Sequence, residues 1–99
     1  MTEDLFHGLR DRLQSATLEM YVSTFCYDCV RLKKLLDASS VVYETVNISK
    51  VDGAAEKLER ETGKRGVPFM LVNGKTWVRG YHRGGLDAKL FADELAAAL

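Results

Sequence analysis

Residues 18–36 read LEMYVSTFCYDCVRLKKLL and combine two hydrophobic periods in one short segment. The first part alternates like a half-buried strand, which we expect over residues 18–24, with three apolar positions: Leu18, Met20 and Val22. The second part has helical spacing to about Ala38, with one apolar stripe: Leu32, Leu35 and Leu36. The pair Cys26 and Cys29 therefore lies where a strand becomes a helix.

Helical and extended patterns also alternate on both sides of this segment. Leucines at four-residue spacing predict an amphipathic helix over about residues 3–14. Beyond Ala38, β-branched residues predict a strand over residues 41–48. Ser49 with Asp52 then resembles a capping box, which would open a helix that ends near Gly63.

The last third of the chain carries a hairpin signal and a closing helix. Val67-Pro68 requires extended backbone, and Asn73-Gly74 separates apolar runs at 69–72 and 76–78. Gly84-Gly85 breaks the chain before a final helix whose Ala-rich end has high helix propensity.

The element order is helix, βαβ, helix, ββ, helix. Two parallel strands joined by a crossover, plus an antiparallel hairpin, predict an α/β fold with a four-stranded mixed sheet flanked by helices. The helix at the N-terminus is an extra element, so we divide the single domain into an extension (1–16) and a core (17–99).

Composition limits the function classes. The 99 residues suit one domain, which would bury roughly 60 to 70% of its unfolded surface. Formal net charge is zero, so no overall field favours nucleic acid or anionic lipid. The N-terminus lacks the apolar stretch of a secretory signal, and no segment approaches a membrane span of ~20 apolar residues. We therefore expect a cytoplasmic protein with no nucleic-acid or membrane partner. We also expect it to be a monomer.

The cysteine spacing indicates redox chemistry. Closing a loop of two intervening residues stabilises a fold little, so a reactive pair is favoured over a structural one. At a helix start, unpaired N–H groups favour a thiolate and lower the pKa of Cys26. Cys29, one turn on, could attack a mixed disulfide on Cys26. Cys26 and Cys29 are thus the predicted catalytic residues.

Two other uses of the pair stay open. A structural zinc site needs four ligands, and His7 and His82, the remaining candidates, are not spaced as a ligand pair. Two inert buried cysteines would be unusual at a strand-to-helix junction. We predict no metal site.

From Leu18 onward the chain resembles the glutaredoxin family. The matching parts are the strand, Cys26-x-x-Cys29, the helix, Val67-Pro68 before the hairpin, and Gly84-Gly85-Leu86-Asp87, which resembles the family's Gly-Gly-x-Asp element. The resemblance implies a thioredoxin-like fold. It also implies an oxidoreductase that reduces protein disulfides, or mixed disulfides with low-molecular-weight thiols, and is recycled by a reductase.

The resemblance further implies a thiol-binding site, with glutathione or another small thiol as co-substrate and no tightly bound cofactor. In the family, the proline matching Pro68 has a cis bond, and the backbone matching Val67 pairs with the cysteinyl part of glutathione. The implied thiol-binding residues are Tyr27, Lys64, Arg65, Val67, Pro68, Gly85, Leu86 and Asp87. Taken singly, Pro68 could be a trans turn residue, Gly84-Gly85 a loop break, and Lys64-Arg65 a solvated pair.

The chain also departs from the family. Glutaredoxins usually have Pro-Tyr between the cysteines, where this chain has Tyr27-Asp28, and a lysine where it has Ser23. A carboxylate beside the thiols should raise the pKa of Cys26 and make the pair more reducing. Asp28 is therefore the predicted pKa-tuning residue.

A second resemblance concerns residues 77–82, WVRGYH. They are similar to a stretch of the redoxins that reduce ribonucleotide reductase and take electrons from thioredoxin reductase, and the general pattern also fits mycoredoxin-like proteins. Trp77 and Tyr81 would then mark a protein-docking surface, or else belong to the core. A non-catalytic module that binds partners, or an iron–sulfur cluster through Cys26, is the alternative from another class.

Overall fold

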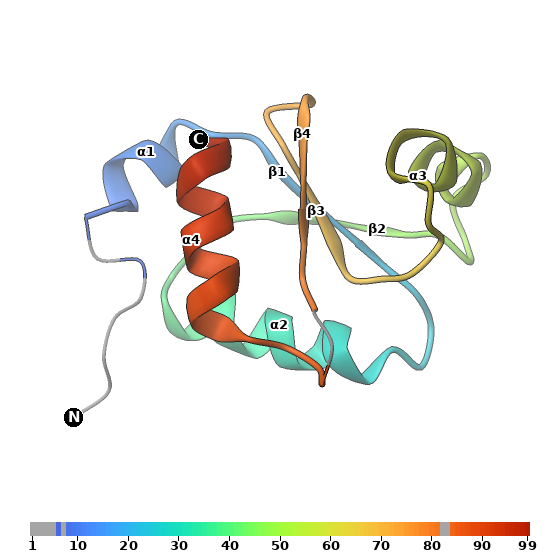
Figure 1. The fold of residues 1–99 in the computed structure, drawn as a ribbon, viewed down its shortest axis with the longest axis horizontal. Coiled ribbons are helices and arrows are strands. Elements are labelled where there is room, and N and C mark those ends of the chain that lie inside the picture. The colour runs from blue at the N-terminus through green and yellow to red at the C-terminus, as the bar shows by residue number, and fades with distance from the viewer. Residues whose placement is uncertain (1–5, 7, 82–83) are drawn as a thin grey trace.

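The computed structural model describes residues 6, 8–81 and 84–99. Four helices and four strands follow one another along the described chain (Figure 1). In order they are α1 (Arg10–Gln14), β1 (Leu18–Val22), α2 (Tyr27–Ala38), β2 (Glu44–Asn47), α3 (Ala54–Thr62), β3 (Phe69–Val72), β4 (Thr76–Arg79) and α4 (Ala88–Ala98).

The strands form one mixed sheet in the order β2-β1-β3-β4. β1 pairs in parallel with β2, whereas the β1–β3 and β3–β4 pairs are antiparallel. All four residues of the inner strand β3 are buried, as expected for a strand covered on both faces. The predicted four-stranded mixed sheet with flanking helices is confirmed.

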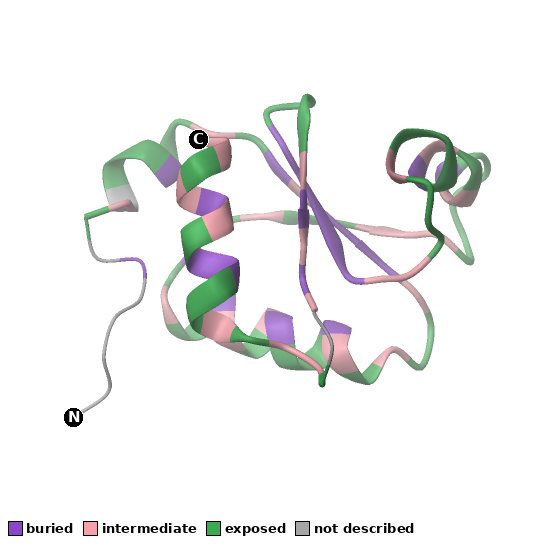
Figure 2. Cartoon of the chain, viewed as in Figure 1, coloured by how far each residue is buried: buried purple, intermediate pink, exposed green. Residues whose placement is uncertain are grey.

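Helices cover both faces of the sheet and create two cores (Figure 2). The larger core, on the side of α2 and α4, includes Met20 of β1 together with Leu32 and Phe91. The smaller core, on the side of α3, includes Tyr21 of β1 and Leu58. Adjacent residues of β1 thus serve opposite cores, which follows from the two-residue period of a strand.

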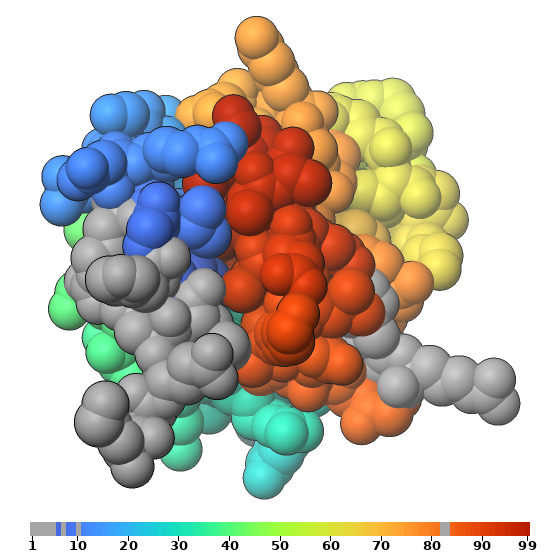
Figure 3. Space-filling view, turned by 60° about the vertical axis from the view of Figure 1, so that its left-hand side comes forward, coloured from blue at the N-terminus to red at the C-terminus, as the bar shows by residue number. Residues whose placement is uncertain are grey.

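The N-terminal helix is shorter than predicted. Gly8 has φ +86°, and α1 begins only at Arg10, so the helix predicted over residues 3–14 is wrong at Phe6, Gly8 and Leu9, which form turns. A left-handed residue cannot continue a right-handed helix, and glycine adopts this conformation freely. Residues 3–5 and 7 of the predicted helix lie outside the described residues. The short helix lies against the C-terminal end of α4 (Figure 3), where Arg12 Nη2 donates to Ala96 O over 3.4 Å.

The strand predicted over residues 41–48 is also shorter. The strand β2, at the edge of the sheet, starts only at Glu44, and its pairing with β1 runs from Glu19–Glu44 to Val22–Asn47. The preceding loop is held by Tyr43, whose hydroxyl donates to Asp37 Oδ1 over 2.9 Å. The pKa of the Tyr43 hydroxyl is raised to about 12. Partial burial is the main cause, and the hydrogen bond to Asp37 and the negative charge of Asp37 add to it.

The predicted capping box before α3 is wrong. The Ser49 N–H instead donates to Asn47 Oδ1 over 2.8 Å, and residues 49–53 form turns with a bend at Val51. Gly53, with φ +81°, precedes the helix without a side-chain cap. Asn47 Oδ1 therefore accepts the Ser49 N–H that Asp52 would accept in a capping box. The predicted end of the helix is confirmed, since Gly63 is its left-handed C-cap.

The hairpin forms where the sequence predicts it. Asn73 and Gly74 have φ of +55° and +68°, the left-handed values that a tight turn between twisted strands requires. Asn73 also exchanges two hydrogen bonds with Thr17, of 2.8 and 2.9 Å, which fix the turn beside the start of β1.

Among the described residues, no helix has the length and apolar character needed to cross a bilayer.

Candidate active site

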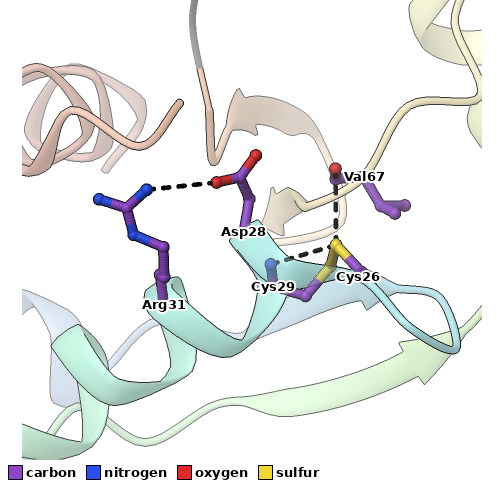
Figure 4. The surroundings of a disulfide bond; sticks show 5 residues. All are labelled: Cys26, Asp28, Cys29, Arg31 and Val67. Carbon is purple, nitrogen blue, oxygen red and sulfur yellow. Dashed lines mark hydrogen bonds and ion pairs between the residues drawn. A yellow bond between two sulfur atoms is a disulfide. The ribbon is translucent and has the colours of Figure 1, made fainter. Parts of the chain in front are cut away.

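The two cysteines lie at the start of α2 and form a disulfide, with their Cα atoms 5.2 Å apart (Figure 4). Cys26 is the N-cap, with extended backbone, and its Sγ accepts a hydrogen bond from the Cys29 N–H over 3.1 Å. The helix start thus directs a free N–H at this sulfur. Cys29 is only 2% exposed, whereas Cys26 is partly exposed, so Cys26 is the sulfur that a partner can reach.

The loop before β3 meets the cysteines from the side. The Val67–Pro68 peptide bond is cis, the geometry that the resemblance implied. The Val67 carbonyl oxygen lies 3.8 Å from Cys26 Sγ, and Figure 4 shows it directed at that sulfur. The Val67 backbone therefore lies next to any group that forms a bond with Cys26 Sγ.

Gly80 lets this loop approach α2. Its N–H donates to Pro68 O over 2.9 Å. A Cβ added at Gly80 would lie 2.6 Å from Leu32 Cδ2 and 2.6 Å from Pro68 Cγ, well inside contact distance. The glycine is thus required by close packing between β4, Pro68 and the helix that carries the cysteines.

The turn before α4 lies against the first turn of α2. A Cβ at Gly85 would be 3.4 Å from Arg31 Nη1 and 3.6 Å from Asp28 Oδ1. Those two side chains form an ion pair of 3.7 Å (Figure 4), and both are partly solvated. Asp87 caps α4 by accepting from the Leu90 N–H over 3.0 Å. Half-buried Leu86, between them, packs against the larger core.

Lys64 and Arg65 lie in the exposed loop after α3. Arg65 Nε donates to Glu59 Oε2 over 2.7 Å, so its guanidinium already has a carboxylate partner. The Lys64 carbonyl accepts from the Thr62 hydroxyl over 2.9 Å, which holds the backbone but leaves the ammonium exposed. A substrate carboxylate that bound Arg65 would have to compete with Glu59.

The aromatic residues of β4 and its extension pack against the protein. The Trp77 ring meets Tyr21 edge-on at 4.8 Å, and its Nε1 donates to Glu61 Oε1 over 3.0 Å. The Arg79 guanidinium lies over the Tyr81 ring, with its Cζ atom 5.0 Å from the ring centroid. The sequence left Trp77 either on a docking surface or in the core, and the partly buried ring packs against the smaller core. His82, and His7 of the zinc alternative, lie outside the described residues.

A hollow of about 340 Å³ opens beside Cys26, and sequence reasoning missed most of its lining. Tyr27, which is 79% exposed, and the two cysteines were predicted site residues, but four others were not: Ser23, Phe25, Val30 and Lys33. Phe25 has φ +63° and is fully exposed. No sequence signal marks a phenylalanine for the left-handed region, which bulky residues rarely adopt. Two other hollows, beside α1, contain no cysteine.

The comparison with known proteins decides the family. A family model described as glutaredoxin matches residues 18–77, which hold the cysteine pair, the cis-proline and most of the sheet. The chain belongs to the glutaredoxin family.

Individual glutaredoxins are moderately similar. The chain is 30% identical over 84 residues to glutaredoxin-C6 of Oryza sativa subsp. japonica, covering 82% of this chain and 70% of that protein. It is 30% identical to glutaredoxin 1 of Rickettsia felis, covering 73% and 67% of the two chains. Among solved structures, a buckwheat glutaredoxin–glutathione complex is 29% identical, with a TM-score of 0.58 and coverage of 98% and 97%.

Membership of the glutaredoxin family, together with the Cys26–Cys29 disulfide, identifies a thiol–disulfide oxidoreductase of thioredoxin-like fold. The partly exposed sulfur, the buried sulfur one turn later and the N–H that joins them form a site for disulfide exchange. Within residues 6, 8–81 and 84–99, no cluster of three or more His, Cys, Asp or Glu side chains is placed to hold a metal ion.

Proposed function

We propose that the protein is a glutathione-dependent dithiol reductase, in which Cys26 is the attacking thiol and Cys29 the resolving one. The observation that carries the assignment is the difference in exposure between the two sulfurs, because the attacking atom must reach a partner and the resolving atom need reach only Cys26. The Cys29 N–H, now directed at Cys26 Sγ, would stabilise a thiolate there in the reduced protein.

The reaction has two steps. The Cys26 thiolate attacks one sulfur of a substrate disulfide, forms a mixed disulfide and releases the other substrate sulfur as a thiolate, which takes up a proton. Cys29, after losing its proton, attacks Cys26 Sγ and releases the second substrate thiolate. The substrate gains two electrons and two protons, and the protein is left with the Cys26–Cys29 disulfide.

Glutathione would return the electrons through the surface around Cys26. Support comes from the buckwheat relative, whose solved structure is a complex with glutathione. We assign backbone pairing with the thiol to Val67 beside Pro68, and the γ-glutamyl end to the turn of Gly85, Leu86 and Asp87 at the start of α4. Contacts with the rest of the tripeptide are assigned to Tyr27, Lys64 and Arg65.

The wider role that we propose is cytoplasmic redox homeostasis. The protein would work as a monomer, transfer electrons to proteins that carry disulfides, and have no nucleic-acid or membrane partner. Residues 17–99 would form the catalytic core and residues 1–16 an extension of it. The zero formal net charge is in accord with partners recognised locally, through their disulfides, rather than through a long-range field.

Asp28 is expected to oppose the thiolate of Cys26. In the reduced protein, Asp28→Asn should lower the pKa of the Cys26 thiol, because it removes a negative charge from the same helix turn. The effect should be below about one pH unit, since the carboxylate is solvated and paired with Arg31. The pH dependence of iodoacetamide alkylation measures this pKa.

Asp11→Asn, on α1 at the other end of the molecule (Figure 1), is the matched control and should leave the alkylation profile unchanged. An equal profile for Asp28→Asn and the original protein would remove Asp28 from the tuning of Cys26.

The identity of the recycling thiol is tested by following NADPH oxidation during reduction of 2-hydroxyethyl disulfide. One arm contains glutathione and its reductase, and the other thioredoxin reductase alone. We expect turnover only in the first arm. Turnover only in the second would transfer the protein to the redoxins linked to ribonucleotide reductase, and turnover in neither would mean another small thiol. Visible absorbance of the purified protein would instead indicate an iron–sulfur module.

A further inference from the structure

Large apolar side chains gather at the reactive sulfur without contributing to the core. Of the six exposed large hydrophobic residues in the described chain, three lie together at the start of α2: Phe25 (102% exposed), Tyr27 (79%) and Val30 (50%). All three line the 340 Å³ hollow that also contains both cysteines. We name these three residues the Phe25 patch.

Phe25 is unfavourable for the fold in two respects. Its side chain is left entirely in water, and its backbone has φ +63°, a conformation that costs energy for any residue with a bulky side chain. The other described non-glycine residues with positive φ are Ser40 and Asn73, which have small or tolerant side chains. Because folding gains nothing from Phe25 here, its position points to a use on the surface.

The chemistry of Cys26 determines what must lie on the Phe25 patch. A substrate sulfur has to reach Cys26 Sγ, so the residues next to that sulfur are brought over the hollow. A volume of 340 Å³ is near the lower limit for ligand pockets and suits one apolar side chain.

Charge at the hollow narrows the choice of substrate. Lys33 lies at its margin, half-buried, and has no ion-pair partner within residues 6, 8–81 and 84–99. Among the described residues, none that lines the hollow is acidic. An anionic group on the substrate would therefore meet an unpaired cation there and no carboxylate.

We propose that the Phe25 patch and Lys33 form a docking groove for protein disulfides, which selects an apolar residue next to the reacting cysteine and a carboxylate beyond it. The proposal rests on the proposed function, in that Cys26 is the attacking thiol, and it names the substrate class of that site. The groove adds no chemical step. It raises the rate at which substrates of this pattern form the mixed disulfide with Cys26.

The test measures the second-order rate constant for oxidation of the pre-reduced protein by peptide disulfides, with no glutathione present. Each probe is a symmetric disulfide of an eight-residue peptide with one cysteine. The reference peptide has leucine beside the cysteine and glutamate two residues further. The comparison peptides replace the leucine by serine or the glutamate by lysine.

We expect the reference to react about tenfold faster than the serine peptide. We expect it to react about two- to fivefold faster than the lysine peptide, with the difference shrinking as salt is added.

Protein variants then locate the preference. Phe25→Asn removes the aromatic ring with a residue that tolerates the left-handed backbone, and should reduce the leucine preference to less than about twofold. Phe25→Trp should retain it, and Lys33→Glu should reverse the charge preference. Val42→Ser, an exposed apolar residue outside the hollow, is the matched control and should behave like the original protein.

Equal rates for all peptides, or preferences that persist in both Phe25→Asn and Lys33→Glu, would overturn the docking groove. These rates need no recycling system, so they are independent of whether glutathione is the reductant. Failure of the glutathione-coupled assay would therefore count against the proposed function and not against the groove.

Discussion

Cys26→Ser should reduce the rate of protein-disulfide reduction to the uncatalysed background, a loss on the order of 10⁴-fold or more, as for other enzymes that lose their nucleophile. The reason is that Cys29 cannot replace it, because Cys29 is 2% exposed. Reduction of insulin disulfides, followed by turbidity, measures the effect. The same assay on Cys29→Ser separates the two roles, since this variant should also fail on protein disulfides.

Cys29→Ser differs from Cys26→Ser on adducts with a single small thiol. A second small thiol can resolve the mixed disulfide on Cys26, so deglutathionylation of a peptide should persist in Cys29→Ser and be absent in Cys26→Ser. Full reduction of protein disulfides by Cys29→Ser, or any retained activity in Cys26→Ser, would contradict the assigned roles.

Gly80→Ala should destabilise the fold by about 1–3 kcal/mol, the usual cost of adding a methyl group to a well-packed site. The new Cβ would meet Leu32 and the Pro68 ring, both of them buried. Gly80 is not among the residues with positive φ, so the cost is one of packing and not of backbone conformation. Thermal unfolding should shift by about 4–8 °C for each kcal/mol lost in a domain of this size.

Gly66→Ala provides a matched comparison. Its Cβ would meet the hydroxyl end of the Tyr81 side chain, which is partly exposed and can move aside. We expect this variant to lose less than about 1 kcal/mol. Equal losses at the two positions would mean that the Gly80 contact does not limit the approach of Pro68 to α2. A lower rate of disulfide exchange in folded Gly80→Ala would further link this contact to the Val67 carbonyl beside Cys26.

Local patterns were sufficient to predict much of the fold. The alternation in β1, the stripe of α2 and the Asn73-Gly74 turn each depend on neighbouring residues. The helix and the turn form where expected, and β1 begins where expected but ends at Val22, two residues before the predicted end. The errors occurred where one residue overrides a pattern. Gly8 stops a helix that the leucine spacing supports, and Asn47 takes the hydrogen bond that the predicted capping box required.

The candidate site was less predictable than the fold, apart from its cysteines. Cys26 and Cys29 were found because their spacing fits one helical turn, a local property. The partnership of Arg65 with Glu59 and the exposure of Phe25 depend on how distant segments pack and how the loop bends. Periodicity carries no information on either. The ion pair with Glu59 limits what Arg65 can contribute to the thiol-binding surface that the family resemblance implied. The exposed Phe25 extends that surface beside Cys26.

The burial of Cys29 also affects how the protein withstands peroxides. An oxidant reaches Cys26 first and converts it to a sulfenic acid, the first and reversible stage of thiol oxidation. Cys29, one helical turn away, can condense with that sulfenic acid, release water and restore the disulfide before the irreversible sulfinic and sulfonic stages. The same shielded thiol that completes the catalytic cycle would therefore limit permanent oxidative damage to the enzyme.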